Sequence, residues 1–243
     1  MRLANKTAII TGAGSGAGLV MARAFAREGA KVVAVDIRAD RLAELEEMIP
    51  DVITVTADVS KEEDVDHVVE TAGKDLDIVC NNAGILDGMA PVDDTSPELW
   101  AHILSVNLTA VYLMCRRSIP VLLQRGGGVI LNTASGGGLR GGRAGAAYTA
   151  SKFGVVGLTQ NIAVTHGPLG IRCNALAPGS MATNIGDGVD FKPRGMHLIT
   201  RDSEAPAPAS PEVIAGAAVF LVADEGAHVN GAILPVDGGL LAF

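Results

Sequence analysis

The sequence predicts one α/β domain, built on a doubly wound and mostly parallel sheet of seven strands with helices on both faces. Short β-branched runs alternate with longer helical patterns along all 243 residues, as in a series of right-handed βαβ crossovers. Several runs are apolar throughout, which is typical of parallel strands buried on both faces. No linker divides the chain, so residues 1–243 are expected to fold as a single domain.

The expected strands are rich in the residue types that favour a pleated, buried backbone. In the first half they are TAIIT at 7–11, KVVAVD at 31–36, VITVTA at 52–57 and LDIVCN at 76–81. GVILNT at 128–133, IRCNALA at 171–177 and AILPVD at 232–237 complete the sheet. Helical patterns fill the intervals at 17–28, 40–48, 61–72, 98–117, 147–166 and 211–223. A helix therefore separates each strand from the next.

Composition argues against two classes of partner. The formal net charge is −8 and Lys and Arg form no cluster, whereas a nucleic-acid partner needs a basic face. The longest apolar run, 217–223, is far shorter than the ~20 residues that span a bilayer. The first apolar stretch stops at Thr11 and Gly12, short of a signal-peptide core of roughly 7 to 15 residues. We therefore expect a cytoplasmic protein with no membrane partner.

The cysteines and histidines do not predict a metal site. Cys80, Cys115 and Cys173 are odd in number and lie in apolar segments, which indicates small buried hydrophobic residues. The five histidines form no pattern of metal-ligand spacing. No metal is expected.

A glycine-rich turn joins the first expected strand to the first expected helix. TGAGSGAG at 11–18 matches G-x-G-x-x-A and the related G-x-x-x-G-x-G. Such a loop lets the backbone approach a pyrophosphate and directs helix N–H groups at it, although a plain tight turn has the same composition. Asp36 ends the second strand 18 residues after Gly18, where a carboxylate accepts hydrogen bonds from ribose hydroxyls. Together the two signals favour a dinucleotide site.

Asp36 also bears on which dinucleotide binds. A 2′-phosphate ~4 Å from a carboxylate is repelled by ~1 to 4 kcal/mol, depending on screening. Arg38 is close in sequence and softens this preference. We expect NAD as the cofactor, with NADP less favoured.

Six motifs occur in one order along the chain. They are TGAGSGAG (11–18), NNAG (81–84), Asn107 in SVNLTA, Ser135 in NTAS, YTASK (148–152) and PGSMAT (178–183). Together they resemble the classical short-chain dehydrogenase/reductases, over essentially the whole chain. The resemblance implies a Rossmann fold and hydride transfer between a nicotinamide cofactor and a secondary alcohol or ketone.

Tyr148 and Lys152 are four residues apart, a spacing that a surface pair on a helix also shows. The resemblance implies that Tyr148 is the general acid/base. A free phenol, with a pKa of about 10, is a poor base at neutral pH. An ammonium ~4 Å away at an effective dielectric constant of ~20 is worth ~4 kcal/mol to the phenolate. Lys152 is therefore expected to lower the pKa of Tyr148, and the resemblance implies that it also binds the nicotinamide ribose.

Two further polar residues complete the implied catalytic set. Ser135 resembles the serine that hydrogen-bonds the substrate oxygen, and Asn107 resembles the asparagine that holds a water in a proton relay. Taken alone, Ser135 is also compatible with a turn before three glycines, and Asn107 with a tolerated surface polar group in a helix.

The resemblance also implies the residues that contact the cofactor. In chain order they are Gly12, Ser15, Gly16, Ala17, Gly18, Asp36, Ile37, Asp58, Val59, Asn81, Ala83, Gly84, Tyr148, Lys152, Pro178, Gly179 and Thr183. Ser15 and Ile37 occupy places where NADP-preferring relatives often carry a basic residue, which again favours NAD. VDGG at 236–239 resembles a C-terminal signature that is often part of a subunit contact, and the family is commonly tetrameric, so a homotetramer is expected.

The substrate side is predicted from three segments. They are the residues after NNAG (Ile85, Leu86, Met89), the glycine-rich stretch 136–145, and an irregular segment at 184–209 that is expected to form a lid with Met196, Leu198 and Ile199. These residues are mostly apolar, which favours a medium-sized apolar small molecule. Arg140, Arg143, Lys192 and Arg194 are the cations that could instead meet a carboxylate or an acyl-carrier phosphate, as in 3-oxoacyl reductases.

Three functions remain open on the sequence. An NAD-dependent secondary alcohol dehydrogenase or ketone reductase, of which a 3-oxoacyl reductase is one variant, is favoured. A reductase of carbon–carbon double bonds is disfavoured, because related proteins of that kind have a longer Tyr-to-Lys spacing. A non-catalytic dinucleotide-binding scaffold would be expected to lack at least one of the four catalytic candidates, and all four are present.

Overall fold

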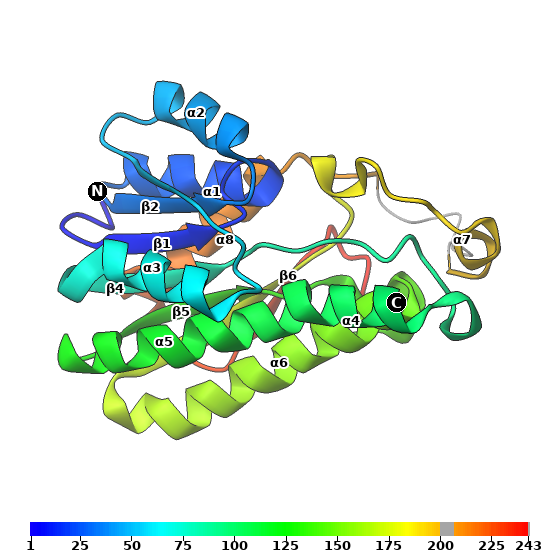
Figure 1. Cartoon of the computed structure of the whole chain (residues 1–243). Helices are drawn as coiled ribbons and strands as arrows, with labels where there is room; N and C mark the ends of the chain where they lie inside the picture. Colours follow the sequence, from blue (N-terminus) through cyan, green and yellow to red (C-terminus); the bar gives the residue numbers. More distant parts are fainter. Residues whose placement is uncertain (200–206, 243) are drawn as a thin grey trace.

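Seven parallel strands form the centre of the structure, a computed structural model that describes residues 1–199 and 207–242. The strands lie in the order β3-β2-β1-β4-β5-β6-β7 (Figure 1), and every neighbouring pair is parallel. They are β1 (Thr7–Thr11), β2 (Lys31–Asp36), β3 (Ile53–Thr56), β4 (Leu76–Asn81), β5 (Gly128–Thr133), β6 (Ile171–Pro178) and β7 (Ile233–Val236). The predicted doubly wound sheet is therefore confirmed.

Helices cover both faces of this sheet. They are α1 (Gly16–Arg27), α2 (Ala39–Met48), α3 (Glu62–Ala72), α4 (Pro97–Leu104), α5 (Ala110–Gln124), α6 (Ala146–His166), α7 (Pro193–Ile199) and α8 (Glu212–Val222). Apolar side chains of α3, α5 and α6 pack on one face, and those of α1, α2 and α8 pack on the other (Figure 1). Each face thus buries its own hydrophobic core.

The central strands contribute to both cores because successive side chains alternate between faces. Ile9 of β1 belongs to the core under α3, α5 and α6, whereas its neighbour Ile10 belongs to the core under α1, α2 and α8. Every residue of β1 and β4 is buried, as the continuous apolar runs predict.

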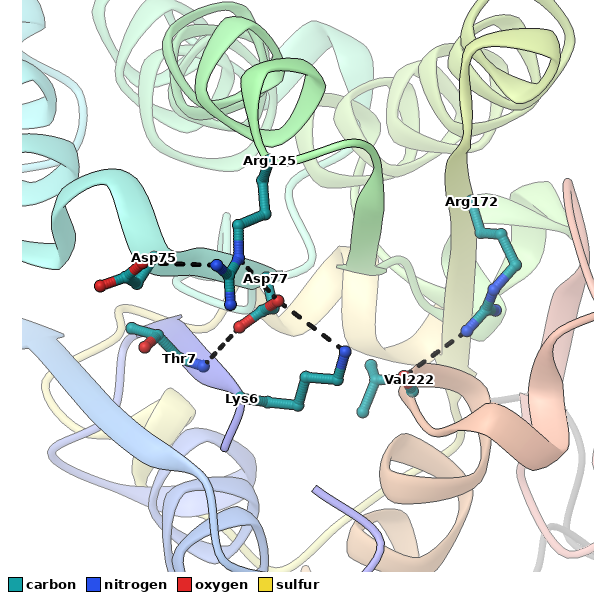
Figure 2. Close-up of polar contacts among 7 residues, drawn as sticks. All are labelled: Lys6, Thr7, Asp75, Asp77, Arg125, Arg172 and Val222. Atoms are coloured by element: carbon teal, nitrogen blue, oxygen red, sulfur yellow. Dashed lines mark hydrogen bonds and ion pairs between the residues drawn. The ribbon is translucent and has the colours of Figure 1, made fainter. Parts of the chain in front are cut away.

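Charged side chains tie the elements together at the amino-terminal edge of the sheet (Figure 2). The Asp77 carboxylate, at the start of β4, accepts a hydrogen bond from the backbone N–H of Thr7 at 2.9 Å. It also pairs with Lys6 at 3.8 Å and with Arg125 at 3.4 Å. Asp77 therefore links β1, β4 and the end of α5.

Arg172 supports the same edge from β6. Its guanidinium donates to the carbonyls of Leu221 at 2.8 Å and of Ala223 at 3.3 Å, at the end of α8. A cation at a helix C-terminus is favourable because the last carbonyls lack intrahelical partners. Arg172 thus joins β6 to the C-terminal end of α8.

Two elements differ from the prediction. The helix expected at 98–117 is divided into α4 and α5 by a π-helical turn at Ser105–Thr109. The segment expected to be irregular at 184–209 contains a short 3₁₀ turn, Asn184–Gly186, and the helix α7, Pro193–Ile199. The remaining part of that expected lid, 200–206, lies outside the described residues.

Within the described part of the chain, the continuous helix Pro97–Gln124 is long and apolar enough to cross a membrane by length and composition. Its buried side chains include Val111, Met114 and Leu122, which belong to the core that also contains strand residues. This helix is therefore a core helix of the fold.

Candidate active site

Most of the implied site residues gather at the carboxyl-terminal edge of the sheet. The order of the strands reverses between β1 and β4, and in doubly wound sheets ligands bind in the crevice beside this switch point. The loops after β1, β4, β5 and β6 carry the glycine motif, NNAG, Ser135 and PGSMAT respectively. The topology thus brings motifs that are spread over residues 11–183 to one edge of the sheet.

Glycine is required at several positions of the loop after β1. Gly12 and Gly16 have φ of 67° and 53°, in the left-handed region that favours glycine. A Cβ at Gly18 would lie 2.0 Å from the carbonyl oxygen of Gly12, so only glycine lets α1 start this close to β1. Ser15, the N-cap residue of α1, makes no side-chain cap. The first N–H groups of α1 therefore have no side-chain acceptor of their own, which suits a phosphate.

The loop after β6 lies directly beside this glycine loop. A Cβ at Gly16 would be 3.2 Å from Thr183. Gly179 donates its N–H to the carbonyl of Val236 at 3.1 Å, and a Cβ there would lie 2.8 Å from the Cα of Asp237. Pro178 ends β6. The glycine loop and the loop after β6, which are both implied to contact the cofactor, are thus neighbours, as the binding of one dinucleotide requires.

Asp36, the expected ribose ligand, is the last residue of β2. Its carboxylate accepts from the backbone N–H of Gly14 at 2.9 Å and of Arg38 at 3.0 Å. The Arg38 guanidinium is turned to Asp40, at 2.5 Å, and that ion pair and hydrogen bond lower the pKa of Asp40 to about 2. Ile37, next in the chain, is 65% exposed.

Arg41 is a neighbour that the motifs did not reveal. Its guanidinium donates to the Ser15 hydroxyl at 3.2 Å, so a cation lies next to the glycine loop. The sequence places Arg41 near the start of the helix after Asp36. This position alone does not predict a contact with the glycine loop, because arginines at such positions are often solvated.

Asp58 and Val59, two of the implied cofactor contacts, lie between β3 and α3. The Asp58 carboxylate accepts from the Ser60 hydroxyl at 2.6 Å and from the Ser60 N–H at 3.1 Å. The hydrogen bond from the Ser60 side chain is the main reason why the pKa of Asp58 lies below its ordinary value. Val59 is buried.

The two asparagines of NNAG play different structural parts. Asn81 is buried in the sheet, where its side chain donates to Asn132 of β5 at 2.9 Å. Asn82 donates to the carbonyl of Thr11 at 3.1 Å and accepts from the Thr133 hydroxyl at 3.3 Å. Asn81 therefore joins strand centres, and Asn82 joins the loops that follow β1, β4 and β5. Ala83 packs against the glycine loop, because a Cβ at Gly12 would lie 2.9 Å from its Cα.

Asn107 is fully buried inside the π-helical turn, so it is not a surface polar group. Its side chain accepts from the N–H of Ile85 at 2.8 Å and donates to the carbonyl of Ile85 at 2.9 Å. It also donates to the Ser151 hydroxyl at 3.3 Å. π-helical turns are frequent at functional sites, and this one clamps the segment after β4.

Tyr148 and Lys152 lie on one buried face of α6, with 7% and 3% of their surfaces exposed. They are therefore not a surface pair. The Lys152 ammonium donates to the carbonyl of Thr133 at 2.8 Å and lies 5.6 Å from the centre of the Tyr148 ring. A Cβ at Gly84 would lie 3.5 Å from the same ammonium. Lys152 is thus placed between the catalytic tyrosine candidate and the segment after β4.

Burial dominates the electrostatics of this pair. It raises the pKa of Tyr148 above its ordinary value of 10; hydrogen bonding with the Ser135 side chain opposes this rise, and the Asp87 carboxylate adds to it. Burial also lowers the pKa of Lys152 to about 8. The predicted lowering of the Tyr148 pKa is therefore not found, because burial removes the phenolate from water and this is the largest effect on its pKa.

Known proteins are similar to this chain over nearly its whole length. A family model described as enoyl-(acyl carrier protein) reductase matches residues 12–241. 3β-Hydroxysteroid dehydrogenase 2 of Eggerthella lenta is 42% identical over 99% of this chain and 96% of its own length.

The chain belongs to the short-chain dehydrogenase/reductase family.

Solved structures of family members show the cofactor class. A 3-ketoacyl-(acyl-carrier-protein) reductase from Brucella melitensis, in complex with NADH, has a TM-score of 0.88 and 38% identity, covering 98% of each chain. A structure from Beutenbergia cavernae with NADP bound at low occupancy has a TM-score of 0.88 and 39% identity, covering 99% of this chain and 98% of that chain. This family member is accordingly an NAD(P)-dependent oxidoreductase that acts on alcohol or ketone substrates.

On the substrate side, Tyr148 faces apolar residues. It packs in a buried cluster with Ile103, Ala144 and Ala147. Ile85, Leu86, Met89 and Leu99 pack against this cluster and remain partly exposed. Three residues that the sequence predicted for the pocket are thus brought to the tyrosine. Of the three residues expected in the lid, Met196 and Ile199 are half-buried, whereas Leu198 is 41% exposed.

The cations predicted as alternative substrate ligands already have partners. Arg194 pairs with Asp93 at 2.7 Å, and Lys192 pairs with Asp190 at 2.6 Å. Arg140 is exposed and donates to the carbonyl of Leu139 in its own turn. Arg143 donates to the carbonyl of Leu240, near the C-terminus, at 3.2 Å.

Proposed function

We propose that this protein is an NAD-dependent dehydrogenase or ketone reductase for apolar secondary alcohols of the size of a hydroxysteroid, with Tyr148 as the general acid/base. The observation that carries the proposal is the position of the Tyr148 phenol, which lies at the meeting point of Ser135, Lys152 and an apolar cluster. The 42% identity to a 3β-hydroxysteroid dehydrogenase supports the substrate class. We further propose that residues 1–243 act as one domain and that 184–209 is its lid.

The chain's own residues divide the work as follows. Ser135 and Tyr148 hold the substrate oxygen by hydrogen bonds, which orients the carbon that reacts. Tyr148 takes the hydroxyl proton in the direction of oxidation and returns it in the direction of reduction. Lys152 lies close enough to favour the phenolate as the proton leaves, and Asn107 holds the segment that carries Gly84 against Lys152.

The glycine loop, Asp36 and the segment at 178–183 fit a dinucleotide, because the loop has no side-chain bulk and Asp36 is fixed at the end of β2. When bound there, the dinucleotide supplies the hydride acceptor or donor. Asp36 supports NAD, since a carboxylate that is held by two backbone N–H groups repels a 2′-phosphate. Relatives with NADH and with NADP are both known, so the proposed preference rests on Asp36 and on the lack of a basic residue at Ser15 and Ile37.

A 3-oxoacyl reductase is the second candidate, supported by the Brucella melitensis relative. It would need cations to meet the carrier phosphate, and Lys192 and Arg194 are instead paired with neighbouring carboxylates. These ion pairs are exposed and contribute little free energy. An acidic substrate could therefore replace the carboxylates of Asp190 and Asp93, which keeps this candidate open.

We also propose a cytoplasmic homotetramer. Tyr112 of α5 and Phe153 of α6 are 47% and 46% exposed, on neighbouring helices of one face. Large exposed apolar side chains of this kind are typical of subunit contacts. Light scattering after gel filtration tests the assembly: a monomer at micromolar concentration would contradict it.

The substrate proposal is tested with the purified protein by following nicotinamide absorbance. The panel contains 3-hydroxysteroids, short linear secondary alcohols and 3-oxoacyl thioesters, each with NAD and with NADP. We expect the highest kcat/KM for a hydroxysteroid or another apolar ring alcohol with NAD. A clear preference for the acyl thioester would favour the second candidate, and no turnover with any member would contradict the proposed reaction.

A further inference from the structure

A buried carboxylate that no motif singled out lies between the segment after β4 and the first turn of α6. Asp87 is 3% exposed. One of its oxygens accepts from the backbone N–H of Tyr148 at 2.9 Å, and the other accepts from the N–H of Met89 at 3.2 Å. A buried carboxylate is costly unless it is well bonded, so this position calls for an explanation.

Helix α6 has no cap in its own sequence. Its N-cap residue, Gly145, has no side chain, and its first turn contains no acidic residue. The segment after β4 provides the acceptors instead: the carbonyl of Ala90 accepts from Ala146 at 2.9 Å, and Asp87 accepts from Tyr148. Because free N–H groups and the positive end of the dipole lie here, a carboxylate stabilises this end of the helix.

Gly145 provides the space for this contact. A Cβ at Gly145 would lie 2.4 Å from both oxygens of Asp87 and 2.6 Å from the backbone nitrogen of Ala90. The φ of Gly145 is −70°, which every residue type adopts, so its backbone conformation does not require glycine. The absence of a side chain is what lets the carboxylate approach the helix.

The segment that carries Asp87 is held on its other sides too. Ile85 forms two hydrogen bonds with the Asn107 side chain. Gly88 is also held in place, because its carbonyl accepts from the N–H of Lys192 at 2.8 Å. Met89 has a φ of 60°, a conformation that is unusual for a residue with a side chain and persists only where the surroundings impose it. Asp87 thus belongs to a rigid connection between the sheet, the expected lid and α6.

We propose that Asp87 is a positioning residue for the reaction: its carboxylate fixes the first turn of α6 and thereby the place and the charge surroundings of the Tyr148 phenol. This proposal rests on the proposed function, in which Tyr148 exchanges the proton. It adds a residue 61 positions away in sequence to the group that controls the tyrosine.

The charged and polar groups around Tyr148 fix the sign of the effect. Among the described residues, Lys152 approaches from α6, Ser135 from the segment after β5 and Asp87 from the segment after β4. Helix α4 contributes only the apolar Ile103 and Leu99 to the cluster. The negative charge of Asp87 opposes ionisation of the phenol and raises the pKa of Tyr148. Removing that charge must therefore move the ionisation of Tyr148 to lower pH.

The chain allows a direct measurement, because Tyr112 and Tyr148 are its only tyrosines. In a Tyr112→Phe background, phenolate absorbance reports Tyr148 alone, and circular dichroism at each pH shows that the protein is still folded. Asp87→Asn keeps an oxygen for the Tyr148 N–H and loses the charge. We expect the Tyr148 midpoint to move to lower pH, and the pH profile of alcohol oxidation to move in the same direction.

Turnover provides the second readout. For Asp87→Ala we expect kcat to fall between about tenfold and about a hundredfold, since a small displacement of a reacting group has effects of this size. The KM for NAD should change less than about twofold. Asp87→Asn should recover most of kcat at its new optimum. Gly145→Ala, which displaces the carboxylate by contact, should lower kcat in the same way as Asp87→Ala.

Asp77→Asn is the matched control, because Asp77 is also a buried carboxylate that accepts a backbone N–H, at the opposite end of β4. It should lower thermal stability without moving the Tyr148 midpoint. A midpoint that is equal in the Asp87→Asn variant and its parent would overturn the proposal, as would an equal shift in Asp77→Asn. If the midpoint moves in a protein that turns over no substrate, the role of Asp87 is supported and the proposed function is what fails, because the absorbance titration needs no turnover.

Discussion

Lys152 makes the protein less stable at neutral pH than it would be without this charge. Its folded pKa of about 8 lies below its ordinary value of 10.5, and burial is the cause. The unfolded chain therefore binds more protons between these two values, so the free energy of unfolding rises with pH through this window. Below pH 8 the cost is complete, and the difference between 10.5 and about 8 corresponds to about 3 kcal/mol.

Lys152→Met removes the charge and keeps most of the volume. The variant also loses the hydrogen bond to the carbonyl of Thr133, which costs about 1 kcal/mol. At pH 7 we therefore expect the variant to gain about 2 kcal/mol in the free energy of unfolding, or about 4 to 8 °C in Tm for a chain of this length. The gain should shrink as the pH rises toward 10.5, while turnover is lost at every pH.

The assay is urea unfolding of wild type and Lys152→Met between pH 6 and pH 10. All samples use one buffer mixture and one protein concentration, so that the oligomeric state is the same in each comparison. Lys61→Met, which removes an exposed lysine, is the control and should leave the free energy of unfolding nearly unchanged. A Lys152→Met variant that is less stable than wild type at pH 7, or a difference that does not depend on pH, would refute the reasoning.

Three further predictions concern other parts of the molecule. Asp36→Ser should raise kcat/KM for NADP about fivefold or more, because repulsion of ~1 to 4 kcal/mol is removed; steady-state kinetics with both cofactors test this, and an unchanged ratio of the two kcat/KM values would contradict the role of Asp36 in NAD preference. Gly18→Ala should weaken NADH binding about tenfold or more in calorimetry, since the added Cβ would lie 2.0 Å from the Gly12 oxygen and overpacking costs about 1 to 3 kcal/mol. Asp77→Ala should lower the free energy of unfolding by about 1 to 3 kcal/mol, because the buried Thr7 N–H loses its acceptor, while kcat stays the same; a loss of kcat with full stability would speak against a purely structural role.

The sheet could be predicted from the sequence because its strands are buried on both faces. The expected strand at 31–36 and the expected strand at 128–133 agree with the structure residue by residue, since apolar β-branched runs between glycine and charged residues leave little choice. The interruption of the helix at 98–117 could not be predicted in this way. The π-helical turn contains no proline or glycine, and the hydrogen bonds of its Asn107 with Ile85 form only in the folded chain.

The motifs indicated several residues that the fold brings together, but they did not indicate the electrostatics of this group. Tyr148, Lys152 and Ser135 follow from motifs, whereas the pKa direction of Tyr148 depends on how deeply the fold buries the ring. The sequence did not single out Asp87, because aspartate is common in turns after strands and its presence there needs no functional explanation. Its link to Tyr148 exists only once α6 has been placed beside the segment after β4. Helix α7 was missed because its surroundings are rich in glycine, proline and charge.

The two tyrosines of the chain allow the central claim to be tested most directly. Tyr148→Phe removes the proposed acid/base, and Tyr112→Phe removes a tyrosine that is 47% exposed on α5. The measurement is kcat for the best alcohol of the panel with NAD, together with the affinity of each variant for NADH. We predict that Tyr148→Phe loses about a hundredfold to ten-thousandfold in kcat with NADH affinity preserved, and that Tyr112→Phe retains wild-type turnover. Substantial turnover by Tyr148→Phe would contradict the account.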